Sequence, residues 1–256
     1  MDAGMSLQLT LIHTNDVHNR WSEVFVAQLR EAKTRYSALL LDAGDSIRSG
    51  NVGVPLSVEP AWAFMAQAGY DVMTIGNREF HITSWGFLAK TRGAPCPLLC
   101  ANLRPKHPDT PVPVQPVWRT VHQGVRVAVL GLTVPMVTPR MKSALLSAYL
   151  FDPPIEVARE WVLRLRPEAD LLIALTHIGY KQDCLLAEAC PQIDVILGGH
   201  SHTPIQPPQQ VNGVWIAQAP PFARGFGVIH LQRMESGRWE IGGGVAKHSH
   251  GDTGAS

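Results

Sequence analysis

The chain has 256 residues, enough to bury the core of one large domain or two small ones. Its 22 Lys and Arg residues balance 21 Asp and Glu residues, and a formal net charge of +1 without basic runs excludes an extended nucleic-acid-binding track. The first ten residues lack the basic and apolar segments of a secretion signal, and no apolar run approaches the roughly 20 residues that span a bilayer, so we expect a cytoplasmic protein with no membrane partner.

Short apolar runs rich in Val, Ile and Leu recur along the chain, and runs of this length predict buried strands. They cover residues 7–12, 38–41, 71–75, 97–100, 125–130, 170–175, 194–198, 214–217 and 227–231. Helical patterns lie between several of them, at residues 22–36, 59–69 and 155–167. Ser22 is placed to cap the first helix, and Gly69 to end the second. The alternation predicts an α/β protein.

The proline-rich stretch at residues 104–118 interrupts this alternation, and we expect it to form a surface loop. Strands of the same type resume after it, so residues 1–241 are predicted to form one domain with an internal loop. Residues 242–256 are polar and rich in Gly, a composition typical of flexible tails. The predicted organisation is one α/β domain followed by a flexible C-terminal tail.

Side chains of the types that bind metals directly follow five of the predicted strands. In chain order they are Asp16 and His18, Asp45, Asn77, His177, and His200 with His202. If these strands share a sheet, the loops converge at one edge of it. Each motif alone is weak, because a single histidine at a strand end is more often structural than a ligand. Five such loops, with Gly44, Gly76, Gly198 and Gly199 nearby to permit sharp turns, favour a metal site.

The composition of this set indicates which chemistry it supports. Two carboxylates, one amide and four imidazoles are mixed oxygen and nitrogen ligands that suit Mn, Zn, Fe or Ni, and seven are too many for one tetrahedral ion. If one carboxylate bridges, they suffice for two divalent ions about 3.5 to 4 Å apart. Two such ions would leave the site net positive, which favours an anion such as phosphate. A water shared by both ions would lose a proton near neutral pH and supply a hydroxide for attack on phosphorus.

The ordered set D-x-H, GD, GN-x-E, TH and GHSH resembles the calcineurin-like metallophosphoesterases. The stretches that carry the resemblance are IHTNDVH (12–18), LLLDAGD (39–45), GNREF (76–80), CANL (100–103), ALTHIG (174–179) and GGHSHTP (198–204). Within that family they are most similar to the N-terminal catalytic domain of the 5′-nucleotidase and 2′,3′-cyclic-nucleotide phosphodiesterase family. The likeness runs from about Leu9 to about Leu231.

This resemblance implies a four-layer α/β/β/α sandwich of two mixed sheets, with the site at the strand ends. It also implies that Asp16, His18, Asp45 and His202 hold one divalent ion. Asp45 would bridge to a second ion held by Asn77, His177 and His200. The implied enzyme is a metal-dependent phosphoric ester hydrolase that acts on a small phosphorylated substrate, with nucleotides among the candidates.

The stretch GNREFH departs from the family pattern GNHEFD, in which the histidine and the aspartate form a dyad that supports the leaving group. Arg78 and His81 take these two positions. Arg78 either makes a surface ion pair, for example with Glu79, or clamps a phosphate oxygen through paired donors. It cannot act as a general acid, because a guanidinium does not release its proton at neutral pH. His81 is the nearest candidate proton donor, or it merely hydrogen-bonds within the loop.

We therefore predict a binuclear metal-dependent phosphoesterase that hydrolyses a phosphomonoester or phosphodiester with a modified leaving-group apparatus. The alternative is a catalytically weak or inactive module that keeps the metals to bind phosphate or a nucleotide. Tight ground-state binding through Arg78 would favour that alternative, because such binding does not by itself accelerate chemistry.

Overall fold

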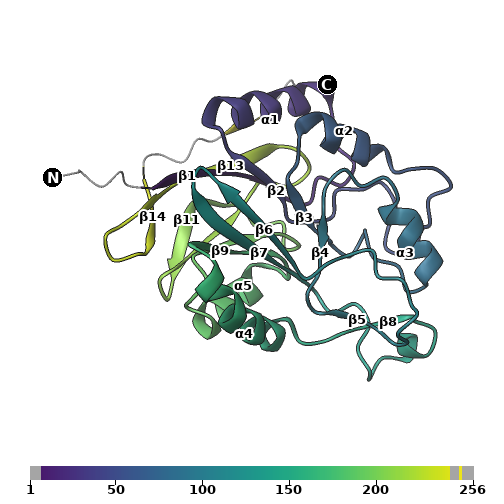
Figure 1. Ribbon diagram of the computed structural model, residues 1–256. Helices are drawn as coiled ribbons and strands as arrows, with labels where there is room; N and C mark the ends of the chain where they lie inside the picture. The colour runs from purple at the N-terminus through teal and green to yellow at the C-terminus, as the bar shows by residue number, and fades with distance from the viewer. Residues whose placement is uncertain (1–6, 243–247, 250–256) are drawn as a thin grey trace.

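Two β-sheets lie face to face in the computed structural model of the protein, and helices cover both outer faces (Figure 1). The structure describes residues 7–242 and 248–249. Alternation along the strands explains the layering. Leu11 of the first strand packs between the sheets with Val127 and Val129, whereas its neighbour Ile12 faces the other way, towards Phe25 of the first helix.

The first sheet is mixed. Its order is β14 (Trp239–Ile241), β13 (Gly225–Arg233), β1 (Gln8–Thr14), β2 (Leu39–Asp42), β3 (Val72–Thr74) and β4 (Leu98–Leu99), with β15 (His248–Ser249) paired to β13. Strands β1 to β4 run parallel, and β13 is antiparallel to β1. The helices α1 (Glu23–Tyr36), α2 (Pro60–Ala68) and α3 (Ser84–Thr91) supply the apolar layer over its outer face.

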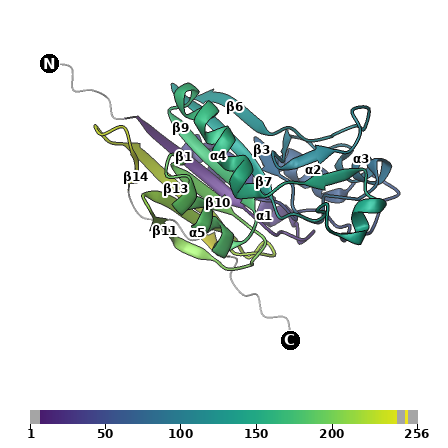
Figure 2. The same cartoon turned by 90° about the horizontal axis from the view of Figure 1, so that it is seen from below.

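The second sheet is mixed as well. Its order is β11 (Ile205–Val211), β12 (Val214–Gln218), β10 (Val195–Gly198), β9 (Leu171–His177), β7 (Val125–Thr133) and β6 (Val117–His122). Its four central strands are parallel, and the two edge strands are antiparallel to their neighbours. The helices α4 (Pro154–Leu165) and α5 (Tyr180–Ala189) cover its outer face, in front of the strands in Figure 2.

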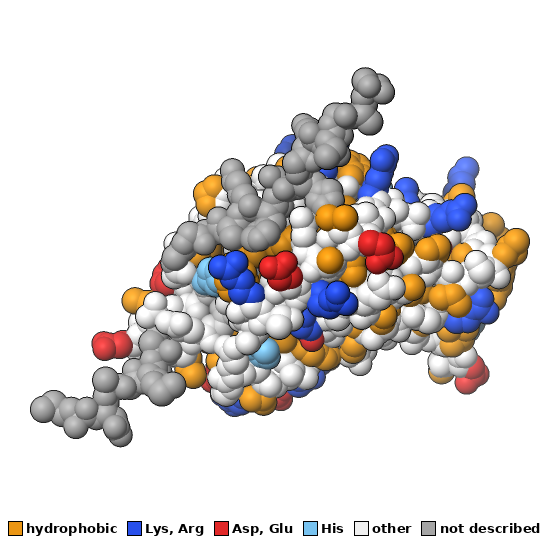
Figure 3. Space-filling view, turned by 90° about the horizontal axis from the view of Figure 1, so that it is seen from above, with side chains coloured by type: hydrophobic (Ala, Val, Ile, Leu, Met, Phe, Trp, Pro, Cys, Tyr) orange, Lys and Arg blue, Asp and Glu red, His pale blue; other side chains and the backbone are white. Residues whose placement is uncertain are grey.

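Smaller elements complete the chain. They are the two-stranded sheet of β5 (Leu103–Pro105) and β8 (Tyr149–Phe151) and the 3-10 turns Lys142–Leu145 and Arg166–Glu168. Among the described residues, no helix has both the length and the apolar character needed to cross a bilayer. On the face seen in Figure 3, the basic side chains that are visible lie scattered among acidic and apolar ones.

The four-layer sandwich of two mixed sheets confirms the predicted fold class. All nine apolar runs form strands, and the three helical patterns form α1, α2 and α4. Ser22 caps α1 by accepting a hydrogen bond from the N–H of Phe25, and Gly69 ends α2 in the left-handed conformation. The premise that the five ligand-bearing strands share one sheet is wrong, because β1, β2 and β3 belong to one sheet and β9 and β10 to the other.

The sequence patterns do not predict several of the described elements. Among these are helices α3 and α5 and the short or polar strands β5, β6, β8, β11 and β14. The proline-rich loop begins in β5 and ends in β6. Residues 243–247 and 250–256 of the predicted tail lie outside the described residues, while His248–Ser249 pair with β13. The boundary between domain and tail stays a prediction.

Candidate metal centre

The seven candidate ligands meet where the carboxyl ends of the parallel strands of both sheets come together. Asp16 and His18 follow β1, Asp45 follows β2 and Asn77 follows β3. His177 is the last residue of β9, and His200 and His202 follow β10. The backbone N–H of His200 donates to Asp16 Oδ2 over 2.9 Å, which ties the two sheets together at this point. The candidate ligands therefore come from both sheets of the sandwich and meet between them.

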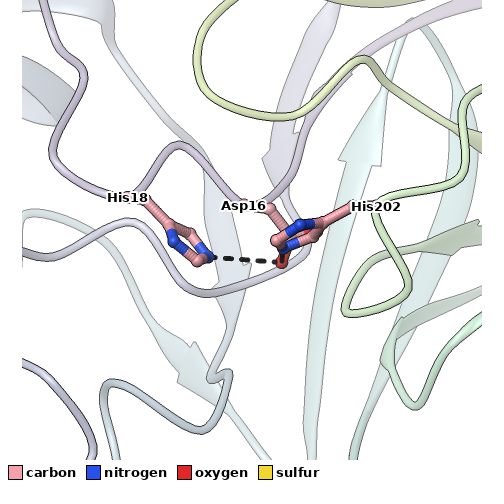
Figure 4. Close-up of side chains that lie close together, drawn as sticks. All are labelled: Asp16, His18 and His202. Carbon is pink, nitrogen blue, oxygen red and sulfur yellow. Dashed lines mark hydrogen bonds and ion pairs between the residues drawn. The ribbon is translucent and has the colours of Figure 1, made fainter.

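One group of ligand atoms surrounds the carboxylate of Asp16. Asp16 Oδ1 lies 3.1 Å from His202 Nε2 and 3.7 Å from His18 Nε2, and Figure 4 shows both imidazoles converging on it. The ligand atoms of these three residues all lie within 4.8 Å of one another. His18 Nε2 is buried and has no hydrogen-bond partner among the described residues, although two carboxylates face it. An orphaned buried nitrogen beside carboxylate oxygens fits a metal ligand.

A second group forms around Asp45. Its Oδ1 lies 3.6 Å from His177 Nε2, while its Oδ2 lies 3.4 Å from His18 Nε2 in the first group. Asn77 Oδ1 lies 3.3 Å from His177 Nε2 and 3.2 Å from His200 Nδ1. Asp45 thus offers one oxygen to each group of imidazoles.

Hydrogen bonds behind the ligands fix their orientation. His177 Nδ1 donates to the carbonyl oxygen of Ala43 over 2.7 Å, which leaves Nε2 free to face Asp45. Asp16 Oδ2 also accepts from Asn15 Nδ2 over 2.8 Å. The buried carboxylate of Glu79 accepts from the backbone N–H groups of Gly76, Asp45, Ser46 and Ile47. Through these bonds Glu79 joins the loop after β2 to the loop after β3.

Five of the seven candidate ligands adopt the left-handed backbone conformation. Their φ angles are 50° for Asp16, 51° for His18, 60° for Asp45, 77° for His200 and 52° for His202. Asp and His tolerate this region better than most residues, but each such residue still costs on the order of 1–3 kcal/mol. Backbone hydrogen bonds between the loops hold them there, such as Asp16 N–H to the Gly44 carbonyl at 2.9 Å. The sequence pattern did not reveal this strain.

The glycines near the ligands mainly allow neighbouring loops to approach each other closely, and only one of them is needed for a turn. Of the four expected to permit sharp turns, only Gly44 has a positive φ, at 93°. A Cβ on Gly76 would lie 2.2 Å from Asp45 Oδ1, and one on Gly199 would lie 2.8 Å from the Ala43 carbonyl oxygen. Gly76 is therefore required because the loop after β3 passes directly against the Asp45 carboxylate.

The electrostatics of the site demand positive charge. Burial alone would lower the pKa of His177, but the Asp45 and Asp16 carboxylates outweigh it and raise this pKa to about 9. Burial opposes the ionisation of Asp45, yet its neighbours, His177 foremost, hold the pKa of this carboxyl well below its usual range. Two buried carboxylates facing imidazole nitrogens form a donor set that fits divalent cations.

Arg78 lies half-buried beside this centre. Its backbone N–H donates to Asp45 Oδ1 over 2.8 Å, and its Nη1 lies 3.2 Å from the carbonyl oxygen of Ile47 and 3.4 Å from that of Arg48. It does not pair with Glu79, whose carboxylate is occupied by backbone N–H groups. Within the described part of the chain, its Nε and Nη2 have no hydrogen-bond partner. These two donors are free to bind an anion.

His81 lies in the same loop, between the end of β3 and the start of α3. Its Nδ1 accepts from the N–H of Thr83 over 3.1 Å and shares a 2.8 Å hydrogen bond with the Thr83 hydroxyl. Its ring lies 5.9 Å from that of Trp85. Burial and the positive charge of Lys90 lower the pKa of His81. No described hydrogen bond joins His81 to the seven candidate ligands, and its role as a proton donor stays a prediction.

Comparison with known proteins identifies relatives of this chain. The family model for calcineurin-like phosphoesterases matches residues 9–204, which include all seven candidate ligands. A 5′-nucleotidase of Vibrio cholerae is 32% identical over 237 residues, covering 80% of this chain and 42% of the relative. The uncharacterized metallophosphoesterase YunD of Bacillus subtilis is 27% identical, covering 89% of this chain and 50% of the relative. The chain thus spans about half the length of these curated relatives.

Solved structures share the fold. The NAD nucleotidase of Haemophilus influenzae superimposes with a TM-score of 0.80 at 20% identity, covering 95% of this chain and 56% of that one. The calcineurin-like phosphoesterase YfkN of Bacillus subtilis gives 0.77 at 22% identity, covering 98% and 93%. Since the family model matches residues 9–204, which is most of the chain, the protein belongs to the calcineurin-like phosphoesterase family.

Proposed function

We propose that the protein is a binuclear metal-dependent phosphoesterase that hydrolyses small phosphorylated compounds, nucleotides among them. The observation that carries this proposal is the position of Asp45, whose two carboxylate oxygens lie 3.6 Å and 3.4 Å from imidazoles of two separate groups. Asp16, His18 and His202 would hold one ion with Asp45. Asn77, His177 and His200 would hold the other.

Two divalent ions held by these residues would lower the pKa of a bound water and polarise the phosphoryl oxygens. Hydrolysis forms a bond from the water oxygen to phosphorus and breaks the ester P–O bond, so the leaving oxygen must gain a proton. The free Nε and Nη2 donors of Arg78 support a role in binding the phosphoryl oxygens through charge-assisted hydrogen bonds. Arg78 cannot supply the leaving-group proton at neutral pH.

Nucleotide substrates are supported by the relatives that are named 5′-nucleotidases, in Vibrio cholerae and Vibrio vulnificus. His81 stays the candidate proton donor nearest to Arg78 along the chain. Its Nδ1 is already engaged by Thr83, so only Nε2 could take part. We propose that the ions are Mn, Zn, Fe or Ni, because these metals suit mixed nitrogen and oxygen ligands.

A substrate panel tests the proposal. The protein is stripped of metal, loaded with Mn, Zn, Fe or Ni, and assayed on phosphomonoesters, cyclic and linear phosphodiesters and nitrophenyl esters. We expect metal-dependent hydrolysis that is lost in Asp45→Asn, and two ions bound per chain. If no substrate is hydrolysed with any of the four metals, the proposed enzymatic activity is refuted. Micromolar binding of phosphate or a nucleotide without turnover would instead establish the phosphate-binding module.

A further inference from the structure

Lys90 is fully buried in the last turn of α3, and the proposed chemistry does not use it. Its ammonium group is surrounded by four backbone carbonyl oxygens: Gly50 at 2.8 Å, Asn51 at 3.2 Å, Arg78 at 2.6 Å and Phe80 at 2.9 Å. A buried cation is tolerated only when hydrogen bonds compensate for lost water, and these carbonyls supply them. The four oxygens come from two separate loops, so Lys90 fastens the loop at 50–51 to the loop after β3.

These two loops also meet through a pair of side-chain amides. Asn77 Nδ2 donates to Asn51 Oδ1 over 2.9 Å. The same rotamer points Asn77 Oδ1 at His177 and His200, at distances of 3.3 Å and 3.2 Å. The Asn77 amide is therefore held with its nitrogen towards the 50–51 loop and its oxygen towards the candidate metal centre.

The orientation of this amide matters because its two ends are chemically different. The carbonyl oxygen of an asparagine has lone pairs to offer a metal, whereas the NH₂ group only donates hydrogen bonds. A half-turn of the amide exchanges the two ends with little change of shape. An acceptor behind Asn77 removes this ambiguity, because it binds NH₂ and leaves the oxygen facing the ion. Asn51 Oδ1 is that acceptor.

We propose that Asn51, anchored through its backbone by Lys90, is a positioning residue that selects the metal-binding orientation of Asn77. This inference rests on the proposed binuclear centre. Partners behind metal ligands typically contribute about 10- to 100-fold to metal affinity. Asn51 is exposed and lies outside the hydrophobic core, so its side chain can be changed without unpacking the fold.

The experiment is a metal titration by isothermal calorimetry on the metal-free full chain, using Mn²⁺. Asn51→Leu keeps the shape of the side chain and removes the acceptor, and Asn51→Asp keeps an acceptor oxygen. Val52→Ala, at the neighbouring position that is 89% exposed, serves as the matched control. We expect Asn51→Leu to weaken one of two sites about 10-fold or more and to spare the other. Asn51→Asp and the control should retain both sites at wild-type affinity or better.

The outcomes separate the inference from the function on which it rests. If the unmodified protein binds fewer than two ions, the binuclear centre fails and the inference fails with it. If it binds two and Asn51→Leu binds both as tightly, only the positioning role is overturned. Equal losses in Asn51→Leu and Asn51→Asp would also overturn it, because the acceptor would then be irrelevant. Melting temperatures measured without metal should be the same for all four proteins.

A double-mutant cycle tests the link to Lys90. Lys90→Met keeps most of the stem and removes the ammonium group. If Lys90 acts by anchoring Asn51, Lys90→Met should weaken the same site, and adding Asn51→Leu should weaken it little further. Fully additive effects on that site would overturn the link. A lower melting temperature is expected for Lys90→Met in any case, because four carbonyl groups lose their donor.

Discussion

His177 donates a hydrogen bond from Nδ1 to the carbonyl oxygen of Ala43 over 2.7 Å. His177 ends β9 in the second sheet and Ala43 follows β2 in the first, so this bond joins the two sheets directly beneath the candidate metal centre. The centre therefore draws its ligands from both halves of the sandwich. Ions bound there would fasten the sheets to each other.

Metal removal should for this reason lower the stability of the whole domain. A ligand at 100 times its Kd stabilises the folded state by about 2.7 kcal/mol. In a chain of this size 1 kcal/mol corresponds to about 2–4 °C, so saturating Mn²⁺ should raise the melting temperature by roughly 5–11 °C relative to EDTA. Differential scanning calorimetry measures the shift. Asp45→Asn should lose most of it, and equal melting temperatures with and without metal would contradict a structural link.

Restoring the family residue at position 78 should change substrate preference. Arg78→His supplies a group that can release a proton near neutral pH, and general acid assistance is typically worth about 10²- to 10⁴-fold. The benefit should be largest for alkyl phosphates, whose leaving oxygen needs a proton, and small for nitrophenyl phosphates. The measurement is kcat/KM across a series of leaving groups. An equal change on every substrate would count against the protonation argument.

The role of His81 can be separated by its pH profile. His81→Asn removes the titrating ring and keeps a hydrogen-bonding side chain near Thr83. If His81 protonates the leaving group, the variant should lose activity on alkyl phosphates by about 10²-fold or more, together with the alkaline limb of the kcat profile. Activity on nitrophenyl phosphates should hardly change and serves as the internal control. An unaltered profile on alkyl phosphates would assign His81 to the loop alone.

Gly76→Ala should damage the centre without adding any polar group. The new Cβ would lie 2.2 Å from Asp45 Oδ1 and 2.6 Å from its backbone nitrogen, so the carboxylate must move. Overpacking of this kind costs about 1–3 kcal/mol, and we expect a matching fall in the free energy of unfolding together with weaker binding of both ions. Gly50→Ala is the matched control, because a Cβ there meets nothing within 4 Å. Urea unfolding and Mn²⁺ titration should distinguish the two variants.

His13 should make the metal-free fold sensitive to acid. It is 1% exposed, neither ring nitrogen has a partner among the described residues, and burial lowers its pKa from 6.5 to about 4. His13 binds a proton more readily in the unfolded chain than in the folded one, so its protonation favours unfolding. The fold therefore keeps its full stability above pH 6.5 and loses part of it as the pH falls towards 4. The loss at pH 4.5 should be on the order of 2–3 kcal/mol.

Urea unfolding of the metal-free protein at pH 7.5 and pH 4.5 measures this loss. Other groups titrate in the same range, so the comparison is with His13→Leu, which removes only this ring. The decrease in unfolding free energy between the two pH values should be smaller in His13→Leu by the amount above. Parallel curves for the two proteins would show that His13 is not responsible.

The sequence by itself determined the strands and the candidate ligands. Most residues of the runs at 125–130 and 170–175 are buried, at 127–130 on one strand and at 171–175 on the other, so their composition alone marks them as strands. Asp16, Asp45 and His177 could be chosen because chemistry in α/β folds gathers at strand ends. The strand pattern could not assign those strands to two sheets, because a strand buried on both faces has the same composition in either sheet. Only the family resemblance implied that there are two sheets. Helix α5 was missed because its apolar periodicity is weak.

The tertiary structure alone decided how the ligands are held. Gly76 approaches Asp45, and Asn77 bonds to Asn51, across segments that are distant along the chain. The left-handed backbone at Asp16 and His202 depends on contacts of the same kind. Lys90 looks like an ordinary last-turn lysine of a helix, and only the fold places four carbonyl oxygens around its ammonium group. Residue type and position along a strand are local properties of the sequence, whereas these contacts exist only once two sheets and their loops have been brought together.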